Sequence, residues 1–196
     1  MSDYTVISAV SSTIQGILKQ NITASSDPAL HGVDIYLLSP KEMQDAGNSL
    51  GISLWLYKVT RMSEMLNEPP QRISPNQIQR TPLPVLLFYL ITPFSPDPGT
   101  RHILLGRVLQ VLYDHAILRG SDLQGVLEGT TEQLRVNLEA LSLEELSLVW
   151  EALSEPYQLS VTYLVQVALI DSEFAPVKSG TVIEKETTYS QILSVT

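Results

Sequence analysis

The segment VLLFYLIT, residues 85–92, decides the fold of this chain. Apolar and aromatic residues follow one another in it until Thr92, so it shows neither a helical period nor alternation. A run of this kind is typical of a β-strand that is covered on both faces. Pro84 and Pro93 bound the run on its two sides. We therefore expect these residues to form the central strand of a sheet.

Other segments have the composition of strands that would flank this one. Residues 52–60 (ISLWLYKVT) are rich in branched and aromatic side chains. In residues 133–141, Leu134, Val136 and Leu138 alternate with polar residues, and residues 157–171 (YQLSVTYLVQVALID) alternate over a longer stretch. A short run from Val33 to Leu38 alternates in the same way.

Three segments have helical periodicity instead, namely residues 4–22, 101–117 and 142–153. The last begins with the spacing of a capping box, in which Ser142 and Glu145 satisfy each other's backbone amides. The order of elements predicts an α+β fold: one mixed β-sheet of about five strands flanked by about three helices, with an extended C-terminal arm.

Residues 62–84 and 173–196 do not fit this pattern. The first stretch contains five prolines and little apolar periodicity, and an irregular loop of this length is more often functional or ordered by a partner than idle. The second has strand propensity in residues 181–195 but too little apolar area to fold alone. We expect a domain over residues 1–172 and an arm over residues 173–196.

The composition excludes several classes of function. The chain has 196 residues, a net charge of −9 and no cysteine. The absence of cysteine rules out thiol catalysis and cysteine-bound metal centres. The negative charge disfavours a nucleic acid partner. No signal sequence is visible and the longest apolar run is too short to span a bilayer, so we expect synthesis and assembly in the cytoplasm, without direct membrane insertion.

We find no constellation of catalytic or cofactor-binding residues. His102 and His115 are too far apart on one expected helix to share a metal, and no nucleophile elbow or phosphate-binding loop is present. Helix capping and helix exposure explain Glu144, Glu145 and Glu151. Trp55 and Trp150 are expected in the core. The chain is therefore expected to be no enzyme and to need no cofactor.

Several blocks of the sequence resemble one family. They are YTVISAVSSTIQGIL, ISLWLYKV, TPLPVLLFYLITPF, HILLGRVLQVLYDH and the stretch from LRVNLEALSLEELSLVWEAL to PYQLSVTYLVQVALIDS, in this order over residues 3–172. They look like the N-terminal domain of the tail cap, or tail-terminator, proteins of contractile injection systems. Only about two dozen residues follow the shared domain here, whereas some relatives carry a longer extension.

The resemblance implies a non-enzymatic structural subunit of a phage-tail-like particle. Such a subunit would form a ring of six copies that ends the inner tube and the surrounding sheath and helps to fix the length of the particle. Its partners would be further copies of itself, the inner tube protein and the sheath protein. The particle would be either released or anchored to a membrane.

Two sets of contact residues follow as hypotheses. Residues 181–195 could add to a sheath domain as an extra strand, with specificity from Val182, Ile183, Tyr189 and Ile192. The loop 62–84 and the start of the helix at residue 101 could contact the tube or neighbouring subunits through Arg72, Arg80, Arg101 and His102.

Two other classes remain open from the residues alone. One is a protein-binding adaptor that is unrelated to tails, and the other is a small-molecule enzyme whose active site is not recognisable in the sequence.

Overall fold

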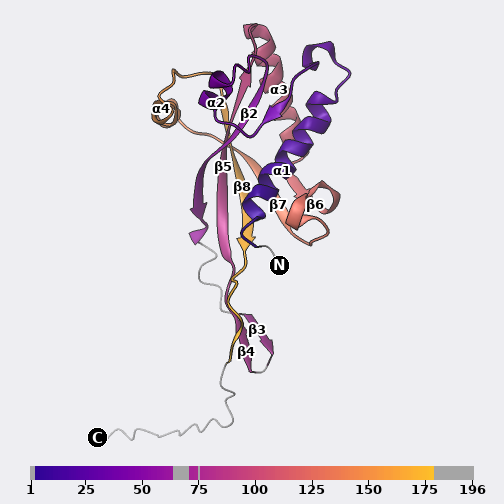
Figure 1. Ribbon diagram of the computed structural model, residues 1–196, viewed down its shortest axis with the longest axis vertical. Helices are drawn as coiled ribbons and strands as arrows, with labels where there is room; N and C mark the ends of the chain where they lie inside the picture. Colours follow the sequence, from indigo (N-terminus) through magenta and orange to yellow (C-terminus); the bar gives the residue numbers. More distant parts are fainter. Residues whose placement is uncertain (1–2, 64–70, 75, 179–196) are drawn as a thin grey trace, which may run out of the picture.

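The computed structural model describes residues 3–63, 71–74 and 76–178. Its body is a six-stranded sheet in the order β1-β2-β5-β8-β7-β6, and a second sheet in the order β3-β4-β9 extends from one end of it (Figure 1). The strands are β1 (Ile35–Tyr36), β2 (Gly51–Arg61), β3 (Gln71–Ser74), β4 (Gln77–Gln79), β5 (Leu83–Phe94), β6 (Ile117–Arg119), β7 (Gln133–Glu139), β8 (Val161–Ile170) and β9 (Val177–Lys178). The helices are α1 (Val6–Leu18), α2 (Pro40–Asp45), α3 (Pro98–Asp114) and α4 (Leu143–Ala152), with short turns of π or 3-10 helix between some of them.

The central strand predicted from VLLFYLIT is β5. It pairs antiparallel with β2 on one side and with β8 on the other. Both neighbours run along nearly its whole length, so the main-chain groups of β5 are satisfied from both sides. Only β1 and β2 are parallel, which makes the sheet mixed. The predicted α+β class with a mixed sheet is confirmed.

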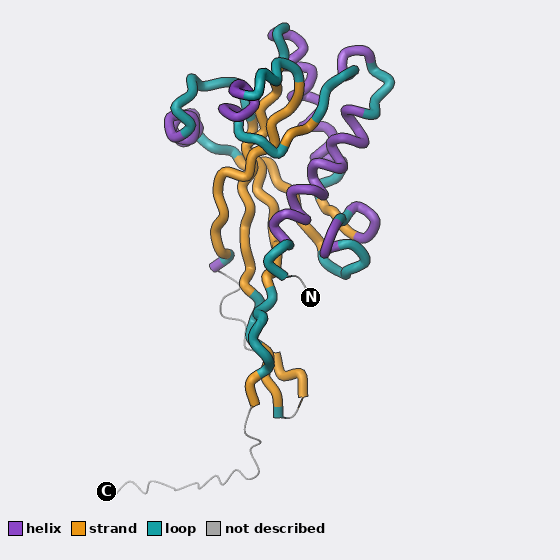
Figure 2. The backbone as a smooth tube through the Cα atoms, in the orientation of Figure 1, coloured by secondary structure: helices purple, strands orange, loops and turns teal. Residues whose placement is uncertain are grey.

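Helices α1 and α3 cover one face of the main sheet (Figure 2). The apolar stripe of α1, from Val6 to Leu18, is buried against inward-facing residues of β5 and β8. A polar contact fixes the register: the hydroxyls of Ser11 and Tyr89 lie 2.8 Å apart in the buried interface. Burial raises the pKa of Tyr89 to about 12, although its bond to Ser11 acts in the other direction.

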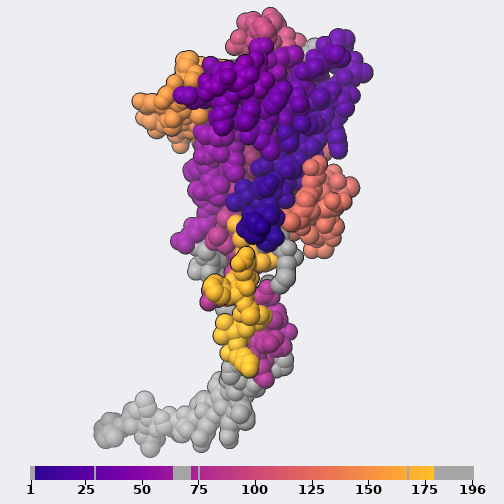
Figure 3. All heavy atoms as spheres, in the orientation of Figure 1, coloured from indigo at the N-terminus to yellow at the C-terminus, as the bar shows by residue number. Residues whose placement is uncertain are grey.

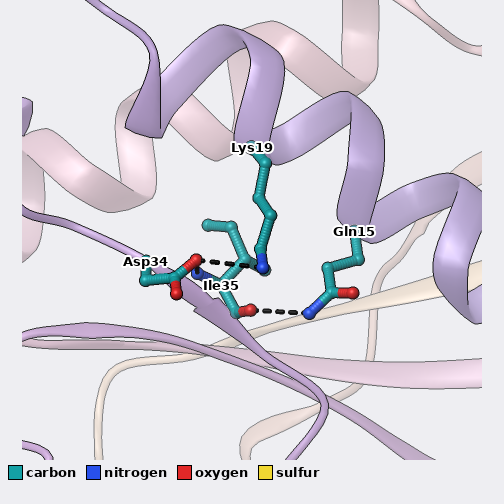
Figure 4. A network of polar contacts seen from close by, with 4 residues as sticks. All are labelled: Gln15, Lys19, Asp34 and Ile35. Carbon is teal, nitrogen blue, oxygen red and sulfur yellow. Dashed lines mark hydrogen bonds and ion pairs between the residues drawn. The ribbon is translucent and has the colours of Figure 1, made fainter.

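Two further contacts join α1 to the edge of the sheet at β1 (Figure 4). The Gln15 side-chain amide donates to the Ile35 carbonyl at 2.7 Å. Lys19 forms an ion pair with Asp34 at 3.2 Å, and both side chains are more than one third exposed. Since solvent screens such a pair, it contributes little to stability, and the Gln15 bond is the more informative contact.

Gly125 shows why one loop can approach α1 closely. Its φ is +63°, and a Cβ placed there would lie 3.3 Å from the Cβ of Ala9. A side chain at this position would be strained by the backbone and crowded by the helix. The loop is also held by Thr13, whose hydroxyl donates to Ala9 and accepts from the Gln124 amide at 3.0 Å.

The structure corrects the expectation of a long irregular loop over residues 62–84. Within it, β3 and β4 pair antiparallel and β5 begins at Leu83. Strand β9 adds to β4, with Val177 opposite Ile78. The reason for the error is physical: a small sheet that is held by main-chain pairing and lacks its own core needs no apolar alternation.

Smaller differences have local causes. The strand expected from Val33 to Leu38 is only Ile35–Tyr36, because Ser39 and Glu42 form a capping box that starts α2. The helix expected to run to residue 117 ends at Asp114, and β6 follows as a sixth strand. Trp150 is buried as predicted, whereas Trp55 is only half-buried, on the sheet face away from α1.

A stability test follows from Thr92. Its hydroxyl is buried and has no hydrogen-bond partner among the described residues. Thr92→Val keeps the shape and the strand preference and removes the unsatisfied group, so we expect it to raise the free energy of unfolding by about 1 kcal/mol. Thr13→Val is the matched control, since it deletes a hydroxyl with two partners and should cost about 1–3 kcal/mol. Urea unfolding of both variants measures this, and a destabilising Thr92→Val would contradict it.

Candidate assembly surfaces

The second sheet projects from the body as a stalk, which we define as β3, β4 and β9 (Figure 1). It continues the direction of β5 and β8, whose last pair is Leu83 with Ile170. Most of its described side chains are exposed to solvent, including the apolar side chains of Ile73 and Val177. Among the described residues this three-stranded sheet has no helix on either face and little buried apolar area, and such a sheet is a poor independent fold. The stalk is therefore a surface suited to contact with another protein.

The stalk carries positive charge in a chain that is acidic overall. Arg72 lies on β3 and is exposed, and Arg80 follows β4. The Arg80 guanidinium lies 4.6 Å from the centre of the Phe174 ring, while Phe174 itself is 70% exposed. This contact orients the arginine and keeps its charge at the surface.

The predicted contact residues do not form one site. Arg72 and Arg80 lie on the stalk, whereas Arg101 and His102 lie in the first turns of α3, near the opposite end of the molecule (Figure 1). The structure therefore divides this set into two separate surfaces. Val182, Ile183, Tyr189 and Ile192 lie outside the described residues.

The α3 end is organised around its cap. Asp97 accepts a hydrogen bond from the Thr100 amide at 2.7 Å, which lowers the pKa of Asp97. Arg101 donates to the Ser95 carbonyl at 2.8 Å and lines an open hollow of about 410 Å³ together with Pro93, Phe94 and Gln158. His102 is exposed. This end presents a fixed arginine beside apolar surface.

A larger pocket, of about 600 Å³, lies between the C-terminal half of α3 and the strands β7 and β8. We call it the α3–β7 pocket; its lining residues are Leu109, Gln110, Leu112, Tyr113, Ala116, Val136, Asn137, Leu138 and Tyr163. The sequence had placed Leu134, Val136 and Leu138 on one face of a strand, which is correct. It gave no sign that α3 leaves the end of that face uncovered at Leu138.

Helix α4 is the least packed of the long helices. Its capping box forms as predicted: the Ser142 hydroxyl accepts from the Glu145 amide at 3.2 Å, and the Glu145 carboxylate accepts from the Ser142 amide at 2.9 Å. Of its ten residues only Trp150 is buried, with its indole donating to Ser160. The helix stands at the side of the body in Figures 2 and 3.

Within the described parts of the chain, no group of three or more histidine or acidic side chains could hold a metal. His115 is occupied by a contact between its Nδ1 and the Val111 carbonyl at 2.9 Å. The carboxyl groups with lowered pKa values, Asp3, Glu42, Asp97 and Glu145, each accept local capping or turn bonds. No helix in the described parts is long and apolar enough to cross a membrane.

Comparison with known proteins identifies the family of this chain. The model of the Pvc16 N-terminal domain family matches residues 9–184. This chain belongs to that family. The resemblance proposed from the sequence blocks is thereby confirmed.

Two solved structures have the same fold. One is the sheath/tube terminator of the extracellular contractile injection system PVC in its extended state, with a TM-score of 0.65 and 16% identity over 99% of this chain and 67% of that one. The other is the tube-terminating cap of the anti-feeding prophage AFP, with a TM-score of 0.60 and 17% identity over 92% of this chain and 60% of that one. This chain thus spans roughly two thirds or less of their length. No curated protein matches it.

The capping box of α4 predicts a pH-dependent contribution to stability. The Ser142 bonds lower the pKa of Glu145 below its ordinary 4.5, so this contribution is fully present above that value and is lost as the pH falls through the lower folded-state pKa. Glu145→Gln keeps the cap geometry without the charge. We expect the unfolding midpoint of the native chain to fall relative to this variant between pH 6 and pH 3. Thermal melts followed by circular dichroism measure these midpoints. If the midpoints of the two proteins change with pH by the same amount, the capping box does not make this contribution.

Proposed function

We propose that this chain caps the end of a contractile injection particle as a structural subunit without enzymatic activity. The observation that carries the proposal is its membership of the Pvc16 N-terminal domain family over residues 9–184. The fold that it shares with a sheath/tube terminator and a tube-terminating cap supports the same role. The surfaces described above are those of a binding protein, with a bare stalk and exposed apolar patches.

We further propose that six copies form a ring, which contacts the last layer of the tube and of the sheath and thereby limits the length of the particle. A ring needs copies to contact one another through two different surfaces, and a terminator needs unlike surfaces for unlike partners. The basic stalk, the Arg101 end, the α3–β7 pocket and α4 supply such separate surfaces. Assembly in the cytoplasm into a particle is part of this proposal.

In this proposal, the stalk and the arm that follows it contact other proteins of the particle. The arm, with Val182, Ile183, Tyr189 and Ile192, adds to a sheath domain as an extra strand in this proposal. Strand addition uses main-chain hydrogen bonds for affinity and alternate side chains for specificity. Support comes from β9, since the chain is already extended and paired with β4 at Lys178. Arg72 and Arg80 would contact the tube or a neighbouring subunit.

The primary test is removal of the chain from a strain that produces particles. Electron microscopy should show tubes of abnormal length or particles without sheath, and return of the native chain should restore them. Particles of normal length and normal sheath in its absence would refute the proposal.

A truncation tests the arm. A stop codon after Lys178 leaves every described strand and helix intact, including β9, so the chain should keep its far-ultraviolet circular dichroism spectrum and its melting temperature. We expect it to join particles that lack a closed sheath, as counted in micrographs. Normal sheathed particles would assign the arm another role.

Charge reversal tests the stalk. Arg72→Glu with Arg80→Glu should leave the fold intact, because both side chains are exposed, and should reduce recovery of the chain in purified particles at least tenfold. Arg119→Glu, at an exposed position on β6, is the matched control. Equal recovery of the two variants would remove the stalk from the contact.

A further inference from the structure

The α3–β7 pocket is an apolar surface that the described part of its own chain does not fill. Tyr113 at its rim is 83% exposed, and Leu138 is also exposed. Contiguous apolar surface of this kind on a folded domain marks a place where another molecule binds.

The polar groups of the pocket indicate what would bind there. Tyr163 is only 4% exposed and lines the pocket. Burial raises its pKa to about 12, so the phenol stays protonated and is available as a donor. Gln110 adds a side-chain amide. Arg107 donates to Gln110 at 2.9 Å and brings a positive charge beside the pocket.

Helix α4 has the complementary chemistry. Leu143 and Leu148 are 66% and 61% exposed, so α4 presents apolar side chains to solvent. The helix and the turn after it carry Glu144, Glu145, Glu151 and Glu155 and no basic residue. The helix thus offers leucines and carboxylates, whereas the pocket offers apolar walls, hydrogen-bond donors and a nearby guanidinium.

The two surfaces lie on opposite faces of the main sheet. Tyr163 is paired with Tyr89 across the strands, and Tyr89 contacts Ser11 of α1, so both belong to the helix-covered face. Lys58 lies 4.5 Å from the centre of the Phe88 ring, on the face opposite Tyr89. Helix α4 lies at the side of the body away from α1 and α3 in Figure 1, and the charge of Lys58 lowers the pKa of Glu145 in its first turn, after the larger effect of the Ser142 bonds.

Because the sheet separates them, we propose that α4 of one copy binds in the α3–β7 pocket of a second copy of this chain. The leucines would fill the apolar part of the pocket, and the α4 carboxylates would accept from Tyr163 and Gln110. Two different surfaces on opposite faces make a head-to-tail contact, which closes into a ring when the rotation between copies allows it. The inference rests on the ring in the proposed function and names the surfaces that form it.

The lack of cysteine in the chain gives a clean test. Tyr113→Cys and Leu148→Cys are made as separate variants, mixed, and treated with a short thiol-specific cross-linker, both as purified protein and in particles. A cross-link between the two variants can form only between copies. We expect a covalent dimer in the mixture, at least tenfold above either variant alone. Phe174→Cys, at an exposed position before β9, replaces Tyr113→Cys in the control mixture and should give none.

The remaining outcomes overturn the inference in distinguishable ways. Native mass spectrometry could detect an intact ring while no cross-link forms between Tyr113→Cys and Leu148→Cys, or while Leu148→Cys cross-links to itself. Either result would reject this contact but not the ring. A cross-link from Leu148 to another particle protein assigns α4 to that protein instead. A chain that stays monomeric and is absent from particles rejects the contact together with the proposed function.

Discussion

The fold depends on the enclosure of β5. This strand is paired on both sides, and α1 covers the face that carries Tyr89. Leu87, Leu90 and Ile91 are fully buried, although they point to both faces of the strand. A shift of one residue would exchange those faces and place Leu90 where Tyr89 meets Ser11, which specifies the register strongly. The two ends of β5 then set the positions of α3 and of the stalk.

The enclosed part of the molecule is also the part that the sequence predicts well. Residues 85–92 have no polar interruption, and the long alternation before Ile170 matches β8. The Ser142–Glu145 spacing gives the start of α4 correctly, because a capping box is a local interaction of adjacent turns. These features are encoded within a few residues of each other.

The stalk could not be predicted in the same way. Strand β4 at Ile78 pairs with β9 at Val177, so the partner lies far away in the sequence. The prolines of residues 69–84 favour extended backbone but do not specify pairing. The open state of the α3–β7 pocket was equally hidden, since Leu138 alternates like a core residue and is exposed only because α3 leaves it uncovered. Trp55 was likewise expected in the core, but it is only half-buried, on the sheet face away from α1.

The distribution of surface chemistry bears on how one chain could serve several neighbours. In the proposed ring, contacts between like copies are repeated, so they can combine modest apolar patches such as Leu148 and Tyr113 on each subunit. Contacts to unlike partners must instead be distinguished from one another. The stalk, with Arg72 and Arg80, and the α3 end, with Arg101, differ in shape and lie at opposite ends of the long axis. If, as proposed, α4 and the α3–β7 pocket bind each other between copies, these two ends remain free for the other contacts of the subunit.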